Sequence, residues 1–284
     1  MAAHKKIFSP ATPEDRQLID MAFNKKRADE RKDWLKTCTP DTFLDHAASE
    51  SVQISEFINK ELILFSQADN VRSIPSMLDG LKPGQRKIMF ACFKRRLKGE
   101  IKVMQLAGYV SEHAAYHHGE QSLCQTIVGL AQNFVGSNNL NLLEPNGQFG
   151  TRLQGGKDAA SPRYIFTALS PFARAVFRPE DDPLLKYLND DGQSIEPEWY
   201  IPILPMVLVN GSEGIGTGWS TTIPSYNPSD IVQNIRHLMN GEEPEDMHPW
   251  YSGFTGSVQI ESGQKYRVTG TWKKIDSTTL EITE

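Results

Sequence analysis

The residue with the clearest potential for covalent chemistry is Tyr164, which follows an arginine at the end of a glycine-rich, basic segment over residues 155–166. A tyrosine hydroxyl, whose ordinary pKa is about 10, is a weak nucleophile at neutral pH. It needs nearby positive charge to stabilise the phenolate and an anionic transition state, and Arg163 is positioned in the chain to supply it. Taken alone, however, the pair is more typical of a core tyrosine beside a surface arginine.

Two adjacent histidines, His117 and His118, follow Tyr116 where a helix is expected to begin. Backbone N–H groups and the helix dipole favour a phosphate at such a position, and imidazoles there can donate hydrogen bonds to its oxygens. By themselves, adjacent histidines are more often exposed or capping groups. They are therefore candidates for phosphate binding only in combination with other signals.

The sequence argues against a metal or nucleotide site in this chain. It has no closely spaced acids of the DxD type, and the paired acids at 181–182 and 190–191 lie in polar segments typical of solvated loops. The glycine-dense segment 211–218 lacks the lysine of a GxxxxGK[ST] phosphate loop. We expect no metal ligand here, so any metal that the chemistry needs must come from another segment.

Charge and composition restrict the class of protein. The net charge of −5 disfavours nucleic-acid binding, but eight basic residues between Lys82 and Lys102 outnumber one acid and give a local balance of +7. No run approaches the roughly 18 apolar residues of a membrane span, and no apolar leader opens the chain, so we expect a soluble intracellular protein of about two domains. Three widely spaced cysteines, Cys38, Cys92 and Cys124, predict buried thiols rather than a disulfide or zinc site.

Several helices are expected before the tyrosine. Thr12 and Pro13 predict the start of a helix in a charged segment that runs to about residue 35, and Pro83 predicts another that runs to about residue 97. Further helices are expected over residues 54–65, 102–107 and 120–134. Short turns followed by glycine-rich sequence fit a helix-turn-helix with a β wing, whose hairpin turns are expected at 146–147 and 155–156.

The pattern changes after the acidic segment 179–183. The short apolar run 202–210 is expected to be a strand, and residues 211–218 a loop. Asn227 is expected to cap a helix that ends near Met239, and the sequence from Gly253 alternates as β-strands do. The expected fold class is therefore α+β.

Eight short segments carry a more specific signal. In chain order they are FINKEL (57–62), RSIP (72–75), DGLKPGQRK (79–87), AYHHGE (115–120), QNFVGS (132–137), QFGTR (148–152), PRYIF (162–166) and EGIGTGW (213–219). Together they resemble eukaryotic DNA topoisomerase II, in the order of that family and from about residue 20 to the end of the chain.

The resemblance implies a role for each matching residue. Tyr164 would attack a DNA phosphodiester and form a 5′-phosphotyrosyl enzyme, with Arg163 stabilising the transition state and His118 contacting the scissile region. Ile215 would wedge between base pairs and bend the DNA. The residues expected to hold the DNA backbone are Arg72, Lys82, Arg86, Lys87, His117, Gln132 and Asn133.

The resemblance also implies a piece of a larger enzyme. It predicts the end of a TOPRIM region and a linker helix at 1–57, a winged-helix domain with the tyrosine at 58–204, and the first part of an α/β tower domain at 205–284. The family's ATPase domain, TOPRIM metal site and coiled-coil gate have no counterpart here, so Mg²⁺ and ATP are expected to bind elsewhere in the full enzyme. The isolated chain is expected to be inactive. The partners and location implied are double-stranded DNA, a homodimer and the nucleus, with no membrane.

Two other interpretations compete with this one. A non-catalytic winged-helix module would bind DNA with a purely structural tyrosine, and a bacterial-type gyrase polypeptide is disfavoured by the PRYIF segment and the glycine-tryptophan loop. The sequence leaves open the isoform, dimerisation of this chain alone, drug binding, and whether the first four residues are native.

Overall fold

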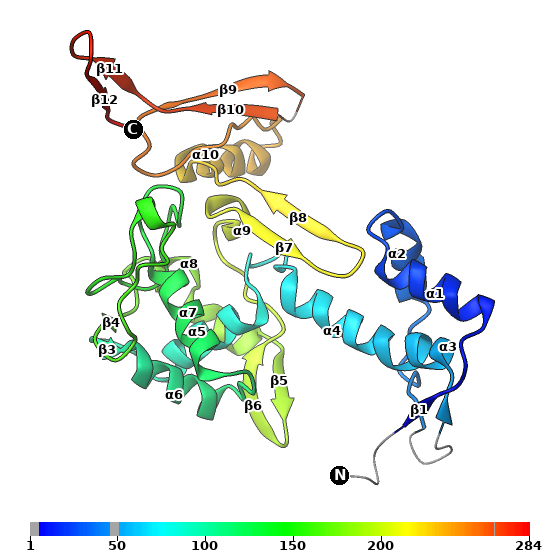
Figure 1. Ribbon diagram of the computed structural model, residues 1–284. Helices are drawn as coiled ribbons and strands as arrows, with labels where there is room; N and C mark the ends of the chain where they lie inside the picture. Colours follow the sequence, from blue (N-terminus) through cyan, green and yellow to red (C-terminus); the bar gives the residue numbers. More distant parts are fainter. Residues whose placement is uncertain (1–5, 46–50, 264) are drawn as a thin grey trace. The chain divides into compact units, whose positions relative to one another are not determined.

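The computed structural model describes residues 6–45, 51–263 and 265–284, with helices and short paired strands mixed along the chain (Figure 1). The chain divides into two compact units, Met1–Pro75 with Glu213–Thr222, and Ser76–Ser212 with Ile223–Glu284. The first four residues, whose origin the sequence left open, lie outside the described residues.

The first unit begins with two helices where one charged segment was expected. Helix α1 (Pro13–Phe23) starts as predicted, because Thr12 Oγ1 accepts from the Asp15 N–H at 3.1 Å and the Asp15 carboxylate accepts from the Thr12 N–H at 2.8 Å. The Thr12 N–H thereby holds the pKa of Asp15 below its usual value. A turn then leads into α2 (Ala28–Lys36).

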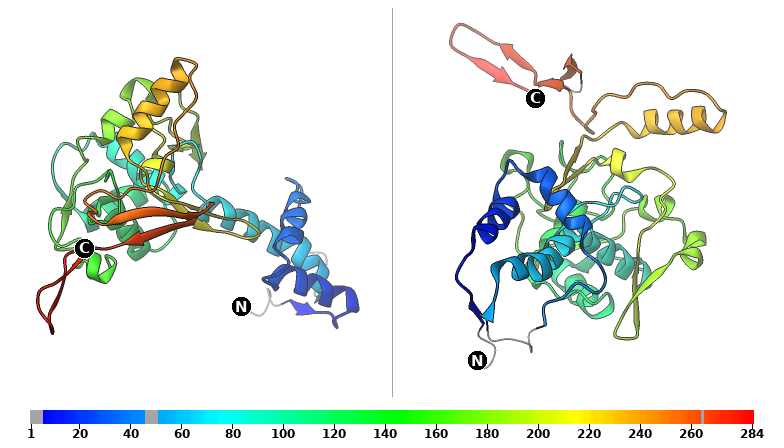
Figure 2. Two further views of the ribbon diagram at one scale, coloured as in Figure 1. Left: turned by 90° about the horizontal axis from the view of Figure 1, so that it is seen from above. Right: turned by 90° about the vertical axis from the view of Figure 1, so that its right-hand side faces the viewer.

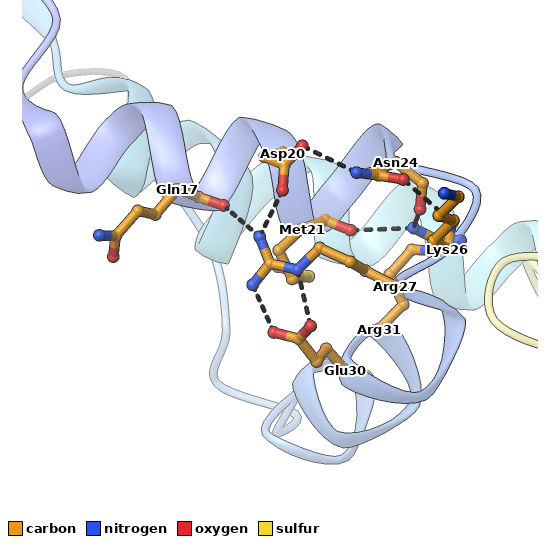
Figure 3. Close-up of polar contacts among 8 residues, drawn as sticks. All are labelled: Gln17, Asp20, Met21, Asn24, Lys26, Arg27, Glu30 and Arg31. Carbon is orange, nitrogen blue, oxygen red and sulfur yellow. Dashed lines mark hydrogen bonds and ion pairs between the residues drawn. The ribbon is translucent and has the colours of Figure 1, made fainter.

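Two arginines join α1 to α2 (Figure 3). Arg27 donates to Asp20 Oδ2 at 2.8 Å and to Glu30 Oε1 at 2.6 Å. Arg31 donates to the Met21 carbonyl at 2.9 Å, which is one of the carbonyls at the end of α1 that no helical N–H can reach. The corner between the two helices is therefore held by charged side chains at their ends.

The helix predicted over 54–65 continues well beyond its expected end. Helix α3 (Ile54–Phe57), a π-helical turn (Ile58–Leu62) and α4 (Ile63–Ser73) follow one another without interruption. The polar residues 66–70 were expected to stop the helix, but the end is set by Pro75, because a residue before proline disfavours helical backbone. Ile74 accordingly has extended dihedral angles.

Most of a β-hairpin also belongs to the first unit. Strands β7 (Ser212–Ile215) and β8 (Ser220–Ile223) pair, so only the tip of the segment expected as a loop is a turn. Two glycines allow the hairpin to approach α4 closely. A Cβ atom at Gly214 would lie 2.3 Å from the Ser73 carbonyl oxygen, and one at Gly216 would lie 2.1 Å from Asn70 Oδ1. The short parallel pair β1 (Ile7–Phe8) and β2 (Ser51–Val52) completes this unit.

Three helices that contact one another build the core of the second unit (Figure 1). They are α5 (Pro83–Lys94), α6 (Val103–His113) and α7 (Glu120–Ala131). Pro83 begins α5 as predicted, while α6 runs six residues past its expected end because Val110 is completely buried in the core. Helix α7 ends before the predicted residue 134, at Ala131.

Short antiparallel pairs replace the hairpins that were predicted for a wing. Strand β3 (Ile101–Lys102) pairs with β4 (Phe166–Thr167), and β5 (Tyr187–Asp190) pairs with β6 (Gln193–Pro197). Residue 146 bridges to Phe166, and residues 155–156 follow a 3-10 turn (Arg152–Gln154), so neither of the two predicted turns closes a hairpin. The long chain between the bridged positions folds as a loop instead.

The remaining elements follow the tyrosine in the chain. They are α8 (Ala173–Val176), a 3-10 segment (Pro179–Leu184), α9 (Met206–Val209), α10 (Pro228–Met239), β9 (Ser257–Ser262), β10 (Lys265–Thr269), β11 (Trp272–Lys274) and β12 (Leu280–Ile282). The run 202–210 was predicted as a strand but forms α9, whose Val209 side chain is completely buried. Asn227 caps α10 as predicted, and the last four strands form two successive hairpins (Figure 2).

The prediction of buried thiols is confirmed for two of the three cysteines, while Cys38 is only half-buried. All three are free thiols, and Cys92 and Cys124 are buried. Burial raises the pKa of Cys92 to about 12, which keeps it protonated and unreactive at neutral pH. No helix among the described residues is long and apolar enough to cross a membrane.

A buried ion pair fixes the start of α5. Arg86 Nε donates to Asp79 Oδ2 at 2.7 Å and Arg86 Nη2 donates to Asp79 Oδ1 at 3.0 Å, and the two residues are 5% and 0% exposed. The same carboxylate accepts the backbone N–H groups of Leu81 at 3.0 Å and Tyr200 at 2.9 Å. Four donors therefore surround one carboxylate and join segments far apart in the sequence.

Replacing this carboxylate tests its structural importance. We expect Asp79→Asn to lower the free energy of unfolding by about 3–5 kcal/mol, because it leaves a buried guanidinium without its counter-charge. Urea denaturation followed by circular dichroism measures the loss. Glu180→Gln, which breaks an exposed ion pair with Arg178 in the same unit, should change stability far less, because solvent screens an exposed pair. Equal effects of the two substitutions would contradict this assignment.

Candidate active site and nucleic-acid interface

Tyr164 projects from a turn at the surface of the second unit. Its side chain is 72% exposed, while the next residue, Ile165, is 1% exposed and anchors the chain in the core. The Tyr164 N–H donates to the Ser161 carbonyl at 2.9 Å, which closes the turn. The core-tyrosine interpretation is therefore wrong, because the phenol is accessible to a large substrate.

The start of helix α6 holds this turn from one side. The Val103 N–H donates to the Ile165 carbonyl at 3.1 Å, and the Met104 N–H donates to the Pro162 carbonyl at 3.2 Å. These are the first N–H groups of a helix, which have no partner within the helix itself. The helix end thereby fixes the backbone on both sides of Tyr164 while leaving its side chain free.

The segment before the turn, residues 148–160, is called the tyrosine loop here, and it is closed by side chains. The Thr151 N–H and Oγ1 donate to the two carboxylate oxygens of Asp158, each at 2.8 Å. Gln132 Nε2 donates to the carbonyls of Phe149 at 2.8 Å and Gly156 at 3.1 Å. The loop that leads to Tyr164 is therefore closed across its middle and tied to the residue after α7.

Gln132 was predicted to bind the DNA backbone, and its placement argues for a different role. Both hydrogens of its side-chain amide are directed at carbonyls of the tyrosine loop. The atom that remains is an acceptor, which cannot bond to a phosphate oxygen. Gln132 therefore braces the loop. Asn133 beside it is exposed and stays a candidate for the predicted contact.

Two of the cations predicted to bind DNA instead pair with carboxylates of the protein itself. Arg86 is enclosed in the ion pair with Asp79 described above, which removes it from the surface. Lys87 Nζ donates to the Ala114 carbonyl at 2.6 Å and to Glu196 Oε2 at 2.9 Å. The prediction of direct backbone contacts is not supported for either residue, because binding a phosphate would leave a buried carboxylate unpaired.

Other predicted cations remain available for a phosphate. Arg163 is exposed and makes no hydrogen bond or ion pair with any described residue. Lys82, the residue before α5, is half-buried, and its ammonium group is likewise without an ion pair in the described ranges. Of the basic side chains in segment 82–102, only the exposed ones therefore offer positive charge to a phosphate. The buried ones in α5 do not.

The two histidines lie just before α7, as predicted. Both are exposed, and Gly119 separates them from the first helical residue. His117 Nε2 lies 3.2 Å from Asp190 Oδ2, and the His118 ring is 5.5 Å from the Tyr116 ring in an edge-on arrangement. No hydrogen bond in the described part of the chain joins His118 to Tyr164.

Two predicted residues belong to the first unit. Arg72 lies in the last turn of α4 and forms an ion pair with Asp69 at 3.1 Å. Ile215 ends β7 and is 76% exposed. The hairpin tip that carries it is held by Asn70, whose Oδ1 accepts from the Thr217 N–H at 2.7 Å and whose Nδ2 donates to the Thr217 carbonyl at 3.1 Å. An apolar side chain is therefore presented to solvent on a braced turn.

Sequence reasoning missed the residues that position the site. Asp158 and Asn70 act through hydrogen bonds to residues 7 and 147 positions away in the chain, and no spacing rule predicts such pairs. The only available signal was their place inside or beside the glycine-rich motifs. Among the described residues no group of three or more His, Cys, Asp or Glu side chains gathers as metal ligands do.

The fold and site define a protein of mixed helices and short strands whose candidate nucleophile is an exposed tyrosine on a braced loop. Residues 72–284 match the family that comprises the A-type subunits of DNA gyrase and topoisomerase IV, and residues 1–70 match the C-terminal associated domain of TOPRIM. The chain therefore belongs to the DNA gyrase/topoisomerase IV family of A-type subunits.

Individual relatives agree with this assignment. The chain is 63% identical over 281 residues to DNA topoisomerase 2 of Candida albicans, covering 99% of this chain and 19% of that protein. It is 56% identical over 295 residues to DNA topoisomerase 2-alpha of Mus musculus, covering 100% and 19%. The chain thus spans about a fifth of the length of these curated relatives.

A solved structure gives the same result for the fold. The Plasmodium falciparum topoisomerase II DNA-binding, cleavage and re-ligation domain matches with a TM-score of 0.84 and 52% identity, covering 97% of this chain and 38% of that one. The resemblance drawn from the eight motifs is confirmed. The mixed helix and sheet composition predicted for the fold is confirmed as well.

The tyrosine loop has a testable pH dependence. The Thr151 N–H holds the pKa of Asp158 below its ordinary value of 3.8. The bond therefore contributes above that ordinary value and is lost as the pH falls through the lower pKa of the folded state. We expect the NMR shift of the Thr151 amide to titrate below pH 3.8, and Thr151→Val, which removes only the hydroxyl donor, to raise the midpoint. A midpoint at or above 3.8 in the unmodified chain would falsify this account.

Proposed function

We propose that this chain is the part of a type IIA DNA topoisomerase that binds and bends duplex DNA and carries the nucleophile for strand cleavage. The main observation behind this proposal is that Tyr164 is exposed on a loop closed by Asp158 and Gln132. The names of the relatives and the DNA-binding, cleavage and re-ligation activity attributed to the solved domain support the same chemistry.

The chemistry uses one oxygen of the protein. Tyr164 Oη gives up its proton and attacks a DNA phosphorus, so that an O–P bond to the 5′-phosphate end of the broken strand forms and the 3′ oxygen of the other end leaves as a hydroxyl. Reversal of the step restores the phosphodiester and the free phenol. Arg163, which has no competing partner among the described residues, offers charge to the transition state, and His118 offers a donor to the scissile region.

Mg²⁺ and ATP belong to other segments of the full enzyme in this proposal. The described residues do not fit a magnesium site, since they contain no cluster of acidic or imidazole ligands. The match of residues 1–70 to a TOPRIM-associated domain supports a metal site supplied by the TOPRIM fold itself. We further propose a homodimer that acts in the nucleus.

The finer architecture is part of the proposal. We infer a TOPRIM end and linker helix at 1–57, a winged-helix domain at 58–204 and the first part of a tower domain at 205–284. Helices α5 to α7 with the β3–β4 pair support the second of these. The compact units divide after Pro75 instead, because the continuous helix from Ile54 to Ser73 carries the chain past the proposed boundary.

Contacts to the DNA backbone are assigned to side chains that remain free to make them. Lys82, His117 and Asn133 of the second unit and Arg72 of the first are the proposed contacts, since all four are at least partly exposed. His117 must release Asp190 to reach a phosphate. Such contacts position DNA without reading its sequence, so they suit an enzyme that acts at many sites.

Removing the nucleophile tests the proposed chemistry. In the full-length enzyme, Tyr164→Phe should abolish covalent DNA adducts and relaxation of supercoiled DNA while changing duplex affinity by less than about threefold, because the substitution removes one hydroxyl and no charge. Denaturing gels of trapped adducts and filter binding measure the two effects. Tyr266→Phe is the matched control.

Two outcomes separate the proposal from its alternative. A non-catalytic binding module predicts that Tyr164→Phe relaxes DNA normally, which would exclude the nucleophile assignment. In this proposal the TOPRIM fold supplies the metal, so the isolated chain should form no adduct with Mg²⁺. An adduct formed by the purified chain without another polypeptide would contradict the division of labour proposed here.

The exposed isoleucine of the hairpin tip gives a second test. We expect Ile215→Ala in the full-length enzyme to reduce bending of a doubly labelled duplex in energy-transfer measurements, because a methyl group cannot unstack a base step as a larger wedge does. Ile282→Ala, an equally exposed isoleucine on β12, is the control and should leave bending unchanged. Unaltered bending in both variants would exclude Ile215 as the wedge.

A further inference from the structure

The second unit contains a half-open cavity that the proposed DNA chemistry does not use. Its volume is about 900 Å³, and its walls come from α5 and the turn after it, the 3-10 segment Pro179–Leu184 and the β5–β6 hairpin. Small-molecule sites in proteins have volumes of roughly 300–1,000 Å³. The cavity is therefore large enough for an organic ligand.

Aromatic rings form much of the cavity wall. Phe90, Phe93, Tyr187 and Tyr200 all line it. Tyr200 packs edge-on against Phe93, with ring centres 5.7 Å apart, and is only 3% exposed. This wall offers flat apolar surfaces against which another ring can pack.

One polar group on this wall lacks a partner. The Tyr200 hydroxyl makes no hydrogen bond with any residue that the structure describes, although its side chain is almost wholly buried. The described chain contains no fully enclosed polar side-chain atom without a partner, so this hydroxyl keeps some accessible surface, and Tyr200 is one of the residues that line the cavity. Buried hydroxyls are nearly always hydrogen-bonded, so a ligand in the cavity could offer this one an acceptor.

Positive charge gathers at the edge of the cavity. Lys94, Arg96 and Lys98 line it, all three are exposed, and none forms an ion pair in the described ranges. The backbone of Arg96 has a φ of +50° at the position after a helix where glycine is usual. The N–H of Arg96 donates to the Phe93 carbonyl at 2.9 Å, which fixes this unusual helix end.

The one acid in the cavity wall is already neutralised. Asp182 accepts from Arg174 Nη2 at 2.8 Å and from Arg174 Nη1 at 3.1 Å. The guanidinium of Arg174 also lies 3.7 Å from the centre of the Phe93 ring. The net charge presented by the wall is therefore that of the three unpaired cations.

We propose that this cavity binds a small organic anion that carries an aromatic ring system. The ring packs against Phe90 and Tyr187, and the anionic group meets Lys94, Arg96 and Lys98. An acceptor atom of the ligand completes the hydrogen bonding of Tyr200. A small molecule is proposed because the cations and the aromatic rings line one cavity of a size typical of small-molecule sites.

Two fluorescent dyes that differ in charge test the proposal on the 284-residue chain. The probe is 8-anilino-1-naphthalenesulfonate, and its neutral counterpart N-phenyl-1-naphthylamine has the same rings without the sulfonate. We expect one sulfonate dye to bind per chain. Lys94→Ala combined with Lys98→Ala should weaken its binding about tenfold and that of the neutral dye less than about twofold.

Further variants separate this cavity from other apolar surfaces. Ser194→Trp, which places a large ring at the cavity wall, should abolish binding of both dyes, and Tyr200→Phe should weaken the sulfonate dye several-fold. Lys265→Ala, an exposed lysine on β10 that does not line the cavity, is the control and should have no effect. Circular dichroism melting curves show that each variant is folded.

Three results would overturn the proposal. They are unchanged sulfonate binding in the Ser194→Trp variant, equal weakening of both dyes by the double lysine substitution, and displacement of the dye by a short duplex. The last result would mean that the three cations belong to the surface of the protein that binds DNA. None of these outcomes depends on Tyr164, so the cavity and the proposed cleavage chemistry are tested separately.

Discussion

The Asp79 carboxylate is the interaction on which the second unit depends most. It is completely buried, and it accepts two bonds from one arginine and two from backbone N–H groups, one of them 121 residues away. A buried charge is tolerated only when its bonds are satisfied in this way. The start of α5 and the segment around Tyr200 are consequently fixed to each other, and with them the helices that support the tyrosine loop.

The basic residues of the DGLKPGQRK segment divide into two groups by burial. Arg86 and Lys87 are tied to Asp79 and Glu196, whereas Lys82 keeps a free ammonium group. The same division holds among the amides, since Gln132 braces carbonyls while Asn133 faces solvent. Neighbouring residues of one motif are therefore either bonded within the protein or left free for the proposed DNA contacts, which explains why a motif alone does not distinguish these roles.

Much of the local structure could be predicted from the sequence. Thr12, Pro13, Pro83 and Asn227 mark helix starts because caps and first-turn prolines act within a few residues. Helix ends were harder to predict. The chain from Ile54 continued through polar residues until a proline stopped it, although only Ile63 and Ser66 of α4 are buried.

The candidate site was predicted from the resemblance of its motifs, while the residues that support it were not predicted. Tyr164 and Arg163 by themselves were more typical of a core tyrosine beside a surface arginine, and only the eight motifs together singled them out. Asp158, Asn70 and the Asp79 ion pair depend on contacts that exist only in the folded protein. The run 202–210 shows the same limit, because its apolar residues fit a strand equally well until Pro205 and the surrounding core select a helix.

The π-helical turn over Ile58–Leu62 has a consequence for the hairpin that carries the exposed isoleucine. A π-turn accommodates one residue more than regular helix does, and one residue corresponds to a rotation of about 100° around the helix axis. The face of α4 that meets the hairpin, including Asn70, is therefore set by this extra residue. Losing a single residue from the turn would leave the rest of the helix unchanged in sequence. It would nevertheless direct Asn70 to another side and release the hairpin tip.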